Sequence, residues 1–112
     1  MSMSNKTLEA RVRAREKIVE VGGHQFTIRR PRAAEMALRD WTRIDLVRNF
    51  VVGWSLTNAE LMPGGTPEPE PFDPALWVDF VDDRQDLWQP LAAAILAEVE
   101  AFKARQGDAE KN

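Results

Sequence analysis

The 112-residue chain has no cysteine, no tyrosine and a single histidine. Without cysteine there are no disulfides, no thiol nucleophile, no iron–sulfur cluster and no cysteine-based zinc site. One histidine, His24, does not suffice for a His-based metal site, and its position beside a glycine pair is typical of a turn residue. No apolar run reaches the ~18 residues of a membrane span, and no hydrophobic segment follows the N-terminus. We therefore expect neither membrane insertion nor secretion.

The residues that are present indicate one soluble, cytoplasmic globular domain. The chain weighs 12.7 kDa, and 44% of its residues are hydrophobic. We expect a basic flexible or helical arm over 1–16, a globular domain over 17–106 and a polar tail over 107–112. Residues 57–71 form an acidic proline-rich loop inside the domain, and loops of this length are often functional or disordered.

Charge is distributed unevenly between the two parts of the chain. Residues 1–43 hold ten basic and five acidic side chains (+5), whereas residues 44–112 hold five basic and thirteen acidic ones (−8), which gives the net charge of −3. The parts are either docked on each other, stacked head to tail between copies, matched to different partners, or simply solvated surfaces of one domain.

A β-hairpin is the clearest local prediction. Two β-prone runs over 17–29 are separated by Gly22 and Gly23, and both central positions of such a turn require positive φ. A two-residue turn places Val19 opposite Phe26 and collects the apolar side chains on one face. Because an isolated hairpin is marginal in water, helices must cover that face. The predicted fold class is α+β, mainly helical, with this hairpin packed against three or four helices.

Helical spacing predicts the elements that follow the hairpin. Pro31 suits the first turn of a helix, and residues 32–55 form one helix or two with a break near Thr42, which favours a cap. We favour the break, with Thr42 or Asp45 as the cap. The apolar series in the second part runs at spacings of three and four, which predicts a helix as far as Trp54.

Two more helices are predicted in the C-terminal part. Asp73 is a good N-cap and Pro74 a good first residue for a short helix. The last helix carries an apolar stripe from Leu87 to Phe102, has Pro90 in its first turn or at a kink, and ends at Gly107.

No reactive constellation is apparent, so we expect neither an enzyme nor a cofactor. Asp79, Asp82, Asp83 and Asp86 would align on one helix, but the glycine turn and bidentate glutamate of a calcium loop are absent. Helix capping and exposure to solvent are sufficient to explain why aspartate occurs at these four positions.

Arginines offer an alternative function. Basic side chains alternate along the arm and cluster again at the end of the hairpin: Arg11, Arg13, Arg15 and Lys17, then Arg29, Arg30 and Arg32. A basic patch beside a strand could follow phosphates, which would make the chain a small nucleic-acid-binding regulator. The pI of 5.2 and the acidic part of the chain argue against it.

The aromatic residues indicate a protein-binding surface more strongly. Four tryptophans are many for this length. Trp88 falls off the apolar stripe of the last helix, and Phe72 stands at the mouth of the proline-rich loop. Exposed aromatic rings beside a mobile loop suit the binding of a peptide or helix. The candidate protein-binding residues are Phe72, Trp77, Trp88, Arg29 and Arg30.

A series of short motifs resembles the small tail assembly chaperones of long-tailed bacteriophages and prophages over roughly residues 18–103. A hairpin ending in Phe-Thr-Ile-Arg-Arg-Pro is followed by a helix bearing Glu35. The later motifs are Phe-Val-Val-Gly-Trp at 50–54, Pro-Gly-Gly at 63–65, Phe72-Asp73 and Asp-Leu-Trp-Gln-Pro-Leu at 86–91. The arm at 1–16 is not covered by the resemblance.

The resemblance implies a non-enzymatic function in tail assembly. Members of that family coat the tape measure protein, a long and mostly helical chain, keep it soluble, and help to recruit tail tube subunits. Many are also made in a longer form by a −1 ribosomal frameshift. The final Glu110-Lys111-Asn112 is compatible with codons that contain the slippery heptamer A-AAA-AAC. The implied partners are the tape measure protein and the tail tube protein, with self-association left open.

Overall fold

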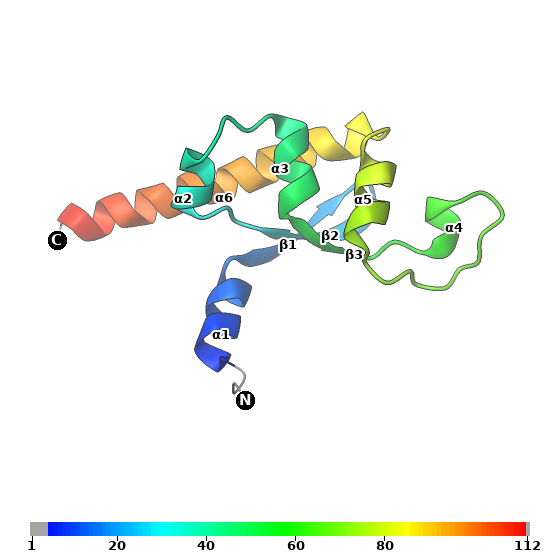
Figure 1. The fold of residues 1–112 in the computed structure, drawn as a ribbon, viewed down its shortest axis with the longest axis horizontal. Coiled ribbons are helices and arrows are strands. Elements are labelled where there is room, and N and C mark those ends of the chain that lie inside the picture. The colour runs from blue at the N-terminus through cyan, green and yellow to red at the C-terminus, as the bar shows by residue number, and fades with distance from the viewer. Residues whose placement is uncertain (1–4, 112) are drawn as a thin grey trace.

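The computed structural model describes residues 5–111, with side chains as far as Asp108. Within this range the chain is an α+β protein, mainly helical, with one three-stranded antiparallel sheet (Figure 1). This confirms the predicted fold class. The elements are α1 (Lys6–Ala14), β1 (Glu16–Val21), β2 (His24–Arg29), α2 (Ala33–Ala37), α3 (Arg43–Phe50), β3 (Val51–Trp54), α4 (Asn58–Leu61), α5 (Pro74–Val81) and α6 (Gln85–Lys111).

The hairpin of β1 and β2 has the predicted register. Val19 pairs with Phe26, and the strands are joined by Gly22 and Gly23 with φ of 60° and 81°. These values suit a tight turn that matches the right-handed twist of the strands. Phe26 and Ile28 are fully buried, so the apolar face of the hairpin forms part of the core.

A third strand completes the sheet, and here the sequence prediction is wrong. Thr42 caps α3 in a reciprocal arrangement with Asp45, which confirms a break before this helix. The helix then ends at Phe50, and β3 pairs antiparallel with β2, giving the order β1-β2-β3. The apolar spacing that predicted a helix up to Trp54 is overridden because pairing with β2 supplies the backbone hydrogen bonds of this segment.

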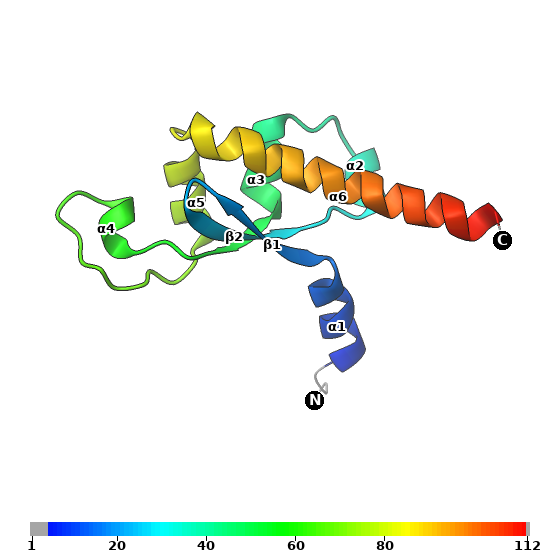
Figure 2. The same cartoon turned by 180° about the vertical axis from the view of Figure 1, so that it is seen from behind.

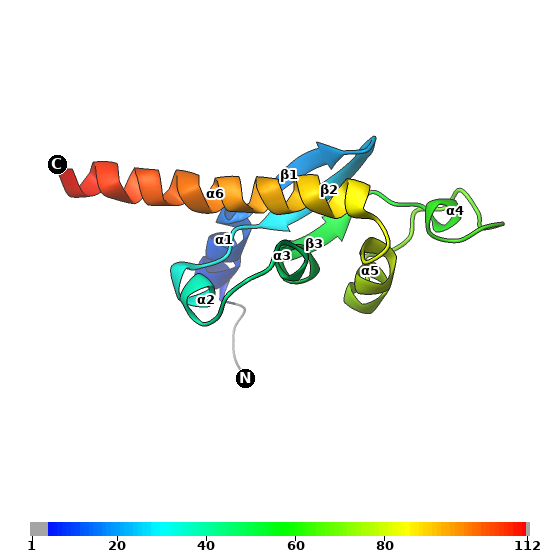
Figure 3. The same ribbon diagram turned by 90° about the horizontal axis from the view of Figure 1, so that it is seen from above.

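The core lies between the sheet and the helices α3, α5 and α6. Helix α6 runs along most of the molecule, and its C-terminal part extends beyond the other elements (Figures 2 and 3). Helix α3 packs against α6, and α5 packs against both. The largest fully buried side chains are Trp77, Phe26, Phe50, Ile28, Leu46, Leu56, Leu87, Leu91 and Ile95.

Helix ends agree with the sequence at some positions and differ at others. Asp73 accepts hydrogen bonds from the first turn of α5, with Pro74 as its first residue, as predicted. Pro31 lies before α2, whose N-cap is Arg32, and therefore not in the first turn. Pro90 is the sixth residue of α6, beyond its first turn. This helix continues through Gly107 to Lys111, so the helix end predicted at Gly107 is wrong; residue 112 lies outside the described residues.

The proline-rich segment 57–71 is more ordered than a simple loop. It contains the short helix α4, which Thr57 caps together with Glu60, and a bridge between Thr57 and Pro69. The indole Nε1 of Trp54 donates to the carbonyl of Glu70 at 2.7 Å. Prolines exclude a long helix here, but capping stabilises a single turn in front of them.

The N-terminal arm forms a helix that projects away from the rest of the chain (Figure 1). Asn5 caps α1, and no residue of this helix is buried. Residues 1–4 of the predicted arm lie outside the described residues. Across the described residues, no helix combines the length and the apolar character that crossing a membrane would require.

Candidate functional site

Trp77 is a core residue, which corrects its assignment to a partner-binding surface. Its side chain is fully buried, and its ring packs against Phe26 at 5.4 Å and Trp54 at 6.0 Å between centroids. The indole Nε1 donates to the carbonyl of Val47 at 3.0 Å. Trp77 is thus inaccessible to a partner while the domain is folded.

Phe72 and Trp88 are half-buried and lie away from the predicted arginines. Phe72 packs edge-on against Trp54 at 4.8 Å between ring centroids, just before α5. Trp88 lies in the first turns of α6 and packs on the core. Both residues therefore belong to the α5 end of the molecule (Figure 1).

Arg29 is the last residue of β2, and Arg30 follows it in the segment that leads to α2. Arg30 stacks on Phe102 of α6, with its guanidinium carbon 3.7 Å from the ring centroid. Its Nη1 donates to the carbonyl of Pro31 at 3.0 Å. Arg29 lies close enough to Glu35 to contribute to the lowered pKa of that carboxyl, which burial opposes and hydrogen bonds from Arg32 favour. The structure therefore does not bring the five predicted residues together.

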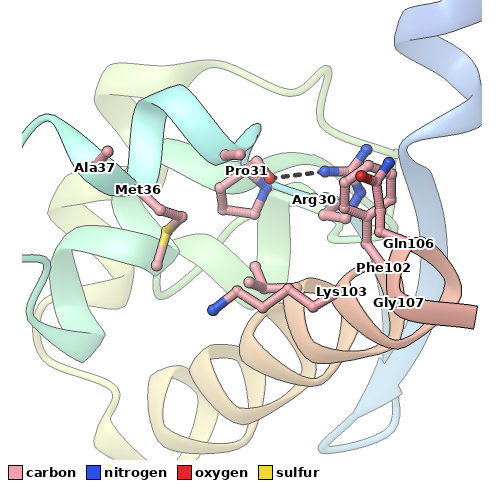
Figure 4. Close-up of a pocket in the computed structure, with 10 residues that line it drawn as sticks. Arg30, Pro31, Met36, Ala37, Phe102, Lys103, Gln106 and Gly107 are labelled. Carbon is pink, nitrogen blue, oxygen red and sulfur yellow. Dashed lines mark hydrogen bonds between the residues drawn. The ribbon is translucent and has the colours of Figure 1, made fainter. Parts of the chain in front are cut away.

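Arg30 lines an open groove between α2 and the C-terminal half of α6, with a volume of about 530 Å³ (Figure 4). Val99 and Pro31 are almost completely buried beneath it, whereas Met36 and Phe102 are half-buried and Lys103 is exposed. The remaining lining residues are Ala33, Ala37, Gln106 and Gly107. The groove is thus apolar inside with basic side chains at its border.

Local interactions hold α2 in place as one wall of this groove. The backbone N–H and the guanidinium Nε of Arg32 donate to Glu35 at 2.9 and 3.0 Å. Trp41, farther along the chain, donates its indole N–H to the carbonyl of Glu35 at 2.9 Å. Because α2 has only five residues, these local hydrogen bonds rather than helix propensity fix its position.

Positive charge is concentrated at the Phe102 end of the groove. Burial lowers the pKa of Arg30, the guanidiniums of Arg15 and Arg105 lower it further, and Glu98 acts in the opposite direction. Arg105 also lies over the ring of Phe102, at 5.9 Å from its centroid. Two guanidiniums therefore lie over the ring of Phe102, and the charge of a third, Arg15, acts on Arg30.

Two of the four aspartates considered as a cation site, Asp82 and Asp86, form ion pairs with arginines. Arg48 donates two hydrogen bonds to Asp82, at 2.9 and 2.6 Å, and lowers the pKa of that carboxyl. Arg84 does the same for Asp86. Across the described residues, no group of three or more histidine, cysteine, aspartate or glutamate side chains is placed to hold a metal ion.

Sequence reasoning missed Met36 and Lys103, and it placed Phe102 on the apolar stripe of the last helix without assigning it to a binding surface. The available signal was the length of the α6 stripe, which continues to Phe102 past the part that α3 can cover. An amphipathic face longer than its covering helices indicates an exposed apolar surface.

Comparison of the chain with models of known protein families, with curated proteins and with solved structures finds no match.

Proposed function

We propose that the protein is a tail assembly chaperone of a bacteriophage or prophage, and that the groove between α2 and α6 holds an amphipathic helix of the tape measure protein. The observation that carries this proposal is the open groove itself, with Met36 and Phe102 accessible above a buried base of Pro31 and Val99. Grooves of this kind bind the apolar face of an amphipathic helix through anchors one helical turn apart.

The sequence motifs support the same assignment. The Phe-Thr-Ile-Arg-Arg-Pro run that resembles the chaperone family supplies Arg30 and Pro31 of the groove. Glu35, another residue of the resemblance, anchors α2 through Arg32. Residues that carry the resemblance thus build the proposed binding surface.

The proposed function is non-enzymatic and requires no cofactor. The chaperone shields apolar helical faces of the tape measure protein until tail tube subunits assemble around it. It acts in the cytoplasm of the bacterial host and is absent from the finished virion. Exposed charges of both signs keep the complex soluble.

Co-expression with the tape measure protein of the same phage or prophage tests this function. We expect the chain to raise the soluble fraction of the tape measure protein and to co-purify with it. Truncation of a central anchor typically costs about 2 kcal/mol or more of binding free energy. Phe102→Ala and Met36→Ala should therefore weaken capture, and circular dichroism checks that both variants remain folded.

Phe72→Ala and Trp88→Ala test the aromatic surface at the other end of the molecule. If these variants lose capture while the folded groove variants retain it, the groove is not the binding surface. If the unmodified chain neither solubilises nor co-purifies with the tape measure protein, the proposed function is wrong.

A nucleic-acid-binding regulator is the second candidate, favoured by the exposed Arg11 and Arg13 on the projecting helix α1. Retention on mixed DNA or RNA that falls steeply with salt would support it. Substitution of both arginines by glutamine should then abolish retention, whereas capture of the tape measure protein should be unaffected.

A further inference from the structure

The end of the groove holds an excess of positive charge that the described residues of the chain do not balance by ion pairs. The backbone N–H of Arg30 donates to the carbonyl of Arg15 at 2.8 Å, so these two residues lie side by side on neighbouring segments. Arg30 and Arg105 both lie over the ring of Phe102, at 3.7 and 5.9 Å. We call Arg15, Arg30 and Arg105 the arginine cluster.

Among the described residues, the carboxylate whose charge acts on Arg30 is already engaged. Glu98 lies 3.4 Å from the ammonium group of Lys17, and its charge also acts on Arg30. The negative charge of Glu98 is thus shared between an ion pair with Lys17 and its effect on Arg30. Within the described part of the chain, no member of the arginine cluster forms an ion pair of its own.

Hydrogen-bonding capacity is also left over. Arg30 uses Nη1 on the carbonyl of Pro31, and Arg15 uses Nη1 in a long hydrogen bond of 3.4 Å to the carbonyl of Arg11. The Nε of Arg15 is buried without a hydrogen-bond partner among the described residues. Buried polar groups in folded proteins are nearly always paired, so this N–H is a donor that the described residues leave unused.

The cluster is continuous with the apolar groove. Phe102 lines the groove, and the guanidiniums of Arg30 and Arg105 lie over its ring. Lys103, the next residue of α6, also lines the groove (Figure 4). A ligand whose apolar side chains reach Met36 and Val99 would therefore present its neighbouring positions to Arg30 and Lys103. Planar guanidinium groups bind carboxylates through paired, charge-assisted hydrogen bonds.

We infer that the groove selects an amphipathic helix of another protein that carries acidic residues along the border of its apolar face, with a carboxylate seated on the arginine cluster. The inference rests on the proposed function for the groove and adds the charge of the bound helix. Because like charges repel in the empty cluster, an incoming carboxylate relieves repulsion as well as forming hydrogen bonds. A helix with lysine at the same positions is repelled, which gives selectivity between helices of equal apolarity.

Three designed peptides test the inference with the full-length protein. They share one amphipathic leucine–alanine face and differ only at the border positions, which hold glutamate, glutamine or lysine. Fluorescence anisotropy at low salt should show the glutamate peptide binding about tenfold more tightly than the glutamine peptide. The lysine peptide should bind most weakly, and the advantage of glutamate should shrink as salt is added.

Variants of the protein locate the selectivity. Arg105→Gln changes an exposed residue of α6 and should remove most of the advantage of the glutamate peptide without affecting the fold. Arg30→Gln should do the same, and thermal unfolding checks its stability. Arg13→Gln is the matched control, because it removes the same charge from the exposed arm outside the cluster.

Each outcome decides the inference. The inference is wrong if the three peptides bind with equal affinity or if the lysine peptide binds most tightly. It is also wrong if the glutamate peptide keeps its higher affinity in the Arg105→Gln variant, or if sedimentation shows a dimer in which a second copy occupies the groove. If the tape measure protein is captured through Phe102 irrespective of Arg105, the inference fails and the proposed function stands. If no tape measure protein is captured although the glutamate peptide binds selectively, the proposed function fails and the charge selectivity stands.

Discussion

Replacement of Trp77 by alanine is the most demanding test of the core. The side chain is fully buried, contacts the rings of Phe26 and Trp54, and donates a hydrogen bond to the carbonyl of Val47. Truncation of a buried tryptophan costs about 3–5 kcal/mol of unfolding free energy. Domains of this size have a total stability of roughly 5–15 kcal/mol, so Trp77→Ala should remove a large share of it.

Two further variants separate the contributions at this position. Trp77→Phe keeps an aromatic ring but loses the hydrogen bond, which is worth about 0.5–1.5 kcal/mol net, so its effect should be smaller than that of alanine. Trp88→Ala removes a half-buried indole and should cost about 1 kcal/mol. Trp88 therefore serves as the control for loss of an indole outside the core.

Urea unfolding followed by far-ultraviolet circular dichroism measures these differences, because the signal reports mainly the backbone and only secondarily the tryptophan that is replaced. The unfolding midpoint gives the change in stability when the dependence on urea is unchanged. If Trp77→Ala destabilises the protein no more than Trp88→Ala does, then Trp77 is not the centre of the core.

Three other predictions follow from the backbone, the caps and the ion pairs. Gly22→Ala should destabilise the protein by about 1 kcal/mol or more in urea unfolding, because φ is +60° and the new Cβ would lie 3.0 Å from a methyl group of Leu87. Gly107 lies inside α6 with open space around its Cα, so Gly107→Ala should stabilise the protein by about 0.5–1 kcal/mol. Asp73→Ala should cost about 1 kcal/mol through loss of the N-cap of α5, whereas Asp73→Asn should retain most of the stability. Arg48 lowers the pKa of Asp82, so the stability from this pair is fully present above the unfolded-state pKa of about 3.9. It is lost as the pH falls through the lower folded-state pKa. Asp82→Asn should therefore flatten the pH dependence of the unfolding free energy below about pH 4, and an unchanged pH profile would contradict the pairing.

Local chemistry made the hairpin and several helix ends predictable. The Gly22-Gly23 pair dictates one turn and therefore one register, and Asp73 before Pro74 marks a helix start on its own. Strand β3 was not predictable in this way, since its residues fit helical spacing equally well. Its identity depends on β2, whose second edge requires a partner, and such tertiary pairing overrides a short periodic pattern.

The candidate site was predictable only in part. Arg30 was singled out from the sequence, but its position over Phe102 joins residues 72 positions apart in the chain. Trp77 was assigned to a surface because aromatic residues near a proline-rich loop suit partner binding, yet the same ring is the largest filler available to the core. No spacing rule distinguishes these two uses of an indole, since both depend on which elements pack around it.

The order of the strands leaves β1 as an edge of the sheet within the described chain. Such an edge can template pairing with another polypeptide, and charged side chains are a common safeguard against it. Three of the six residues of β1, Glu16, Lys17 and Glu20, carry charge, while Ile18 is 64% exposed. Fibril formation through this strand is therefore opposed by those three charged side chains, although the exposed side chain of Ile18 lies among them.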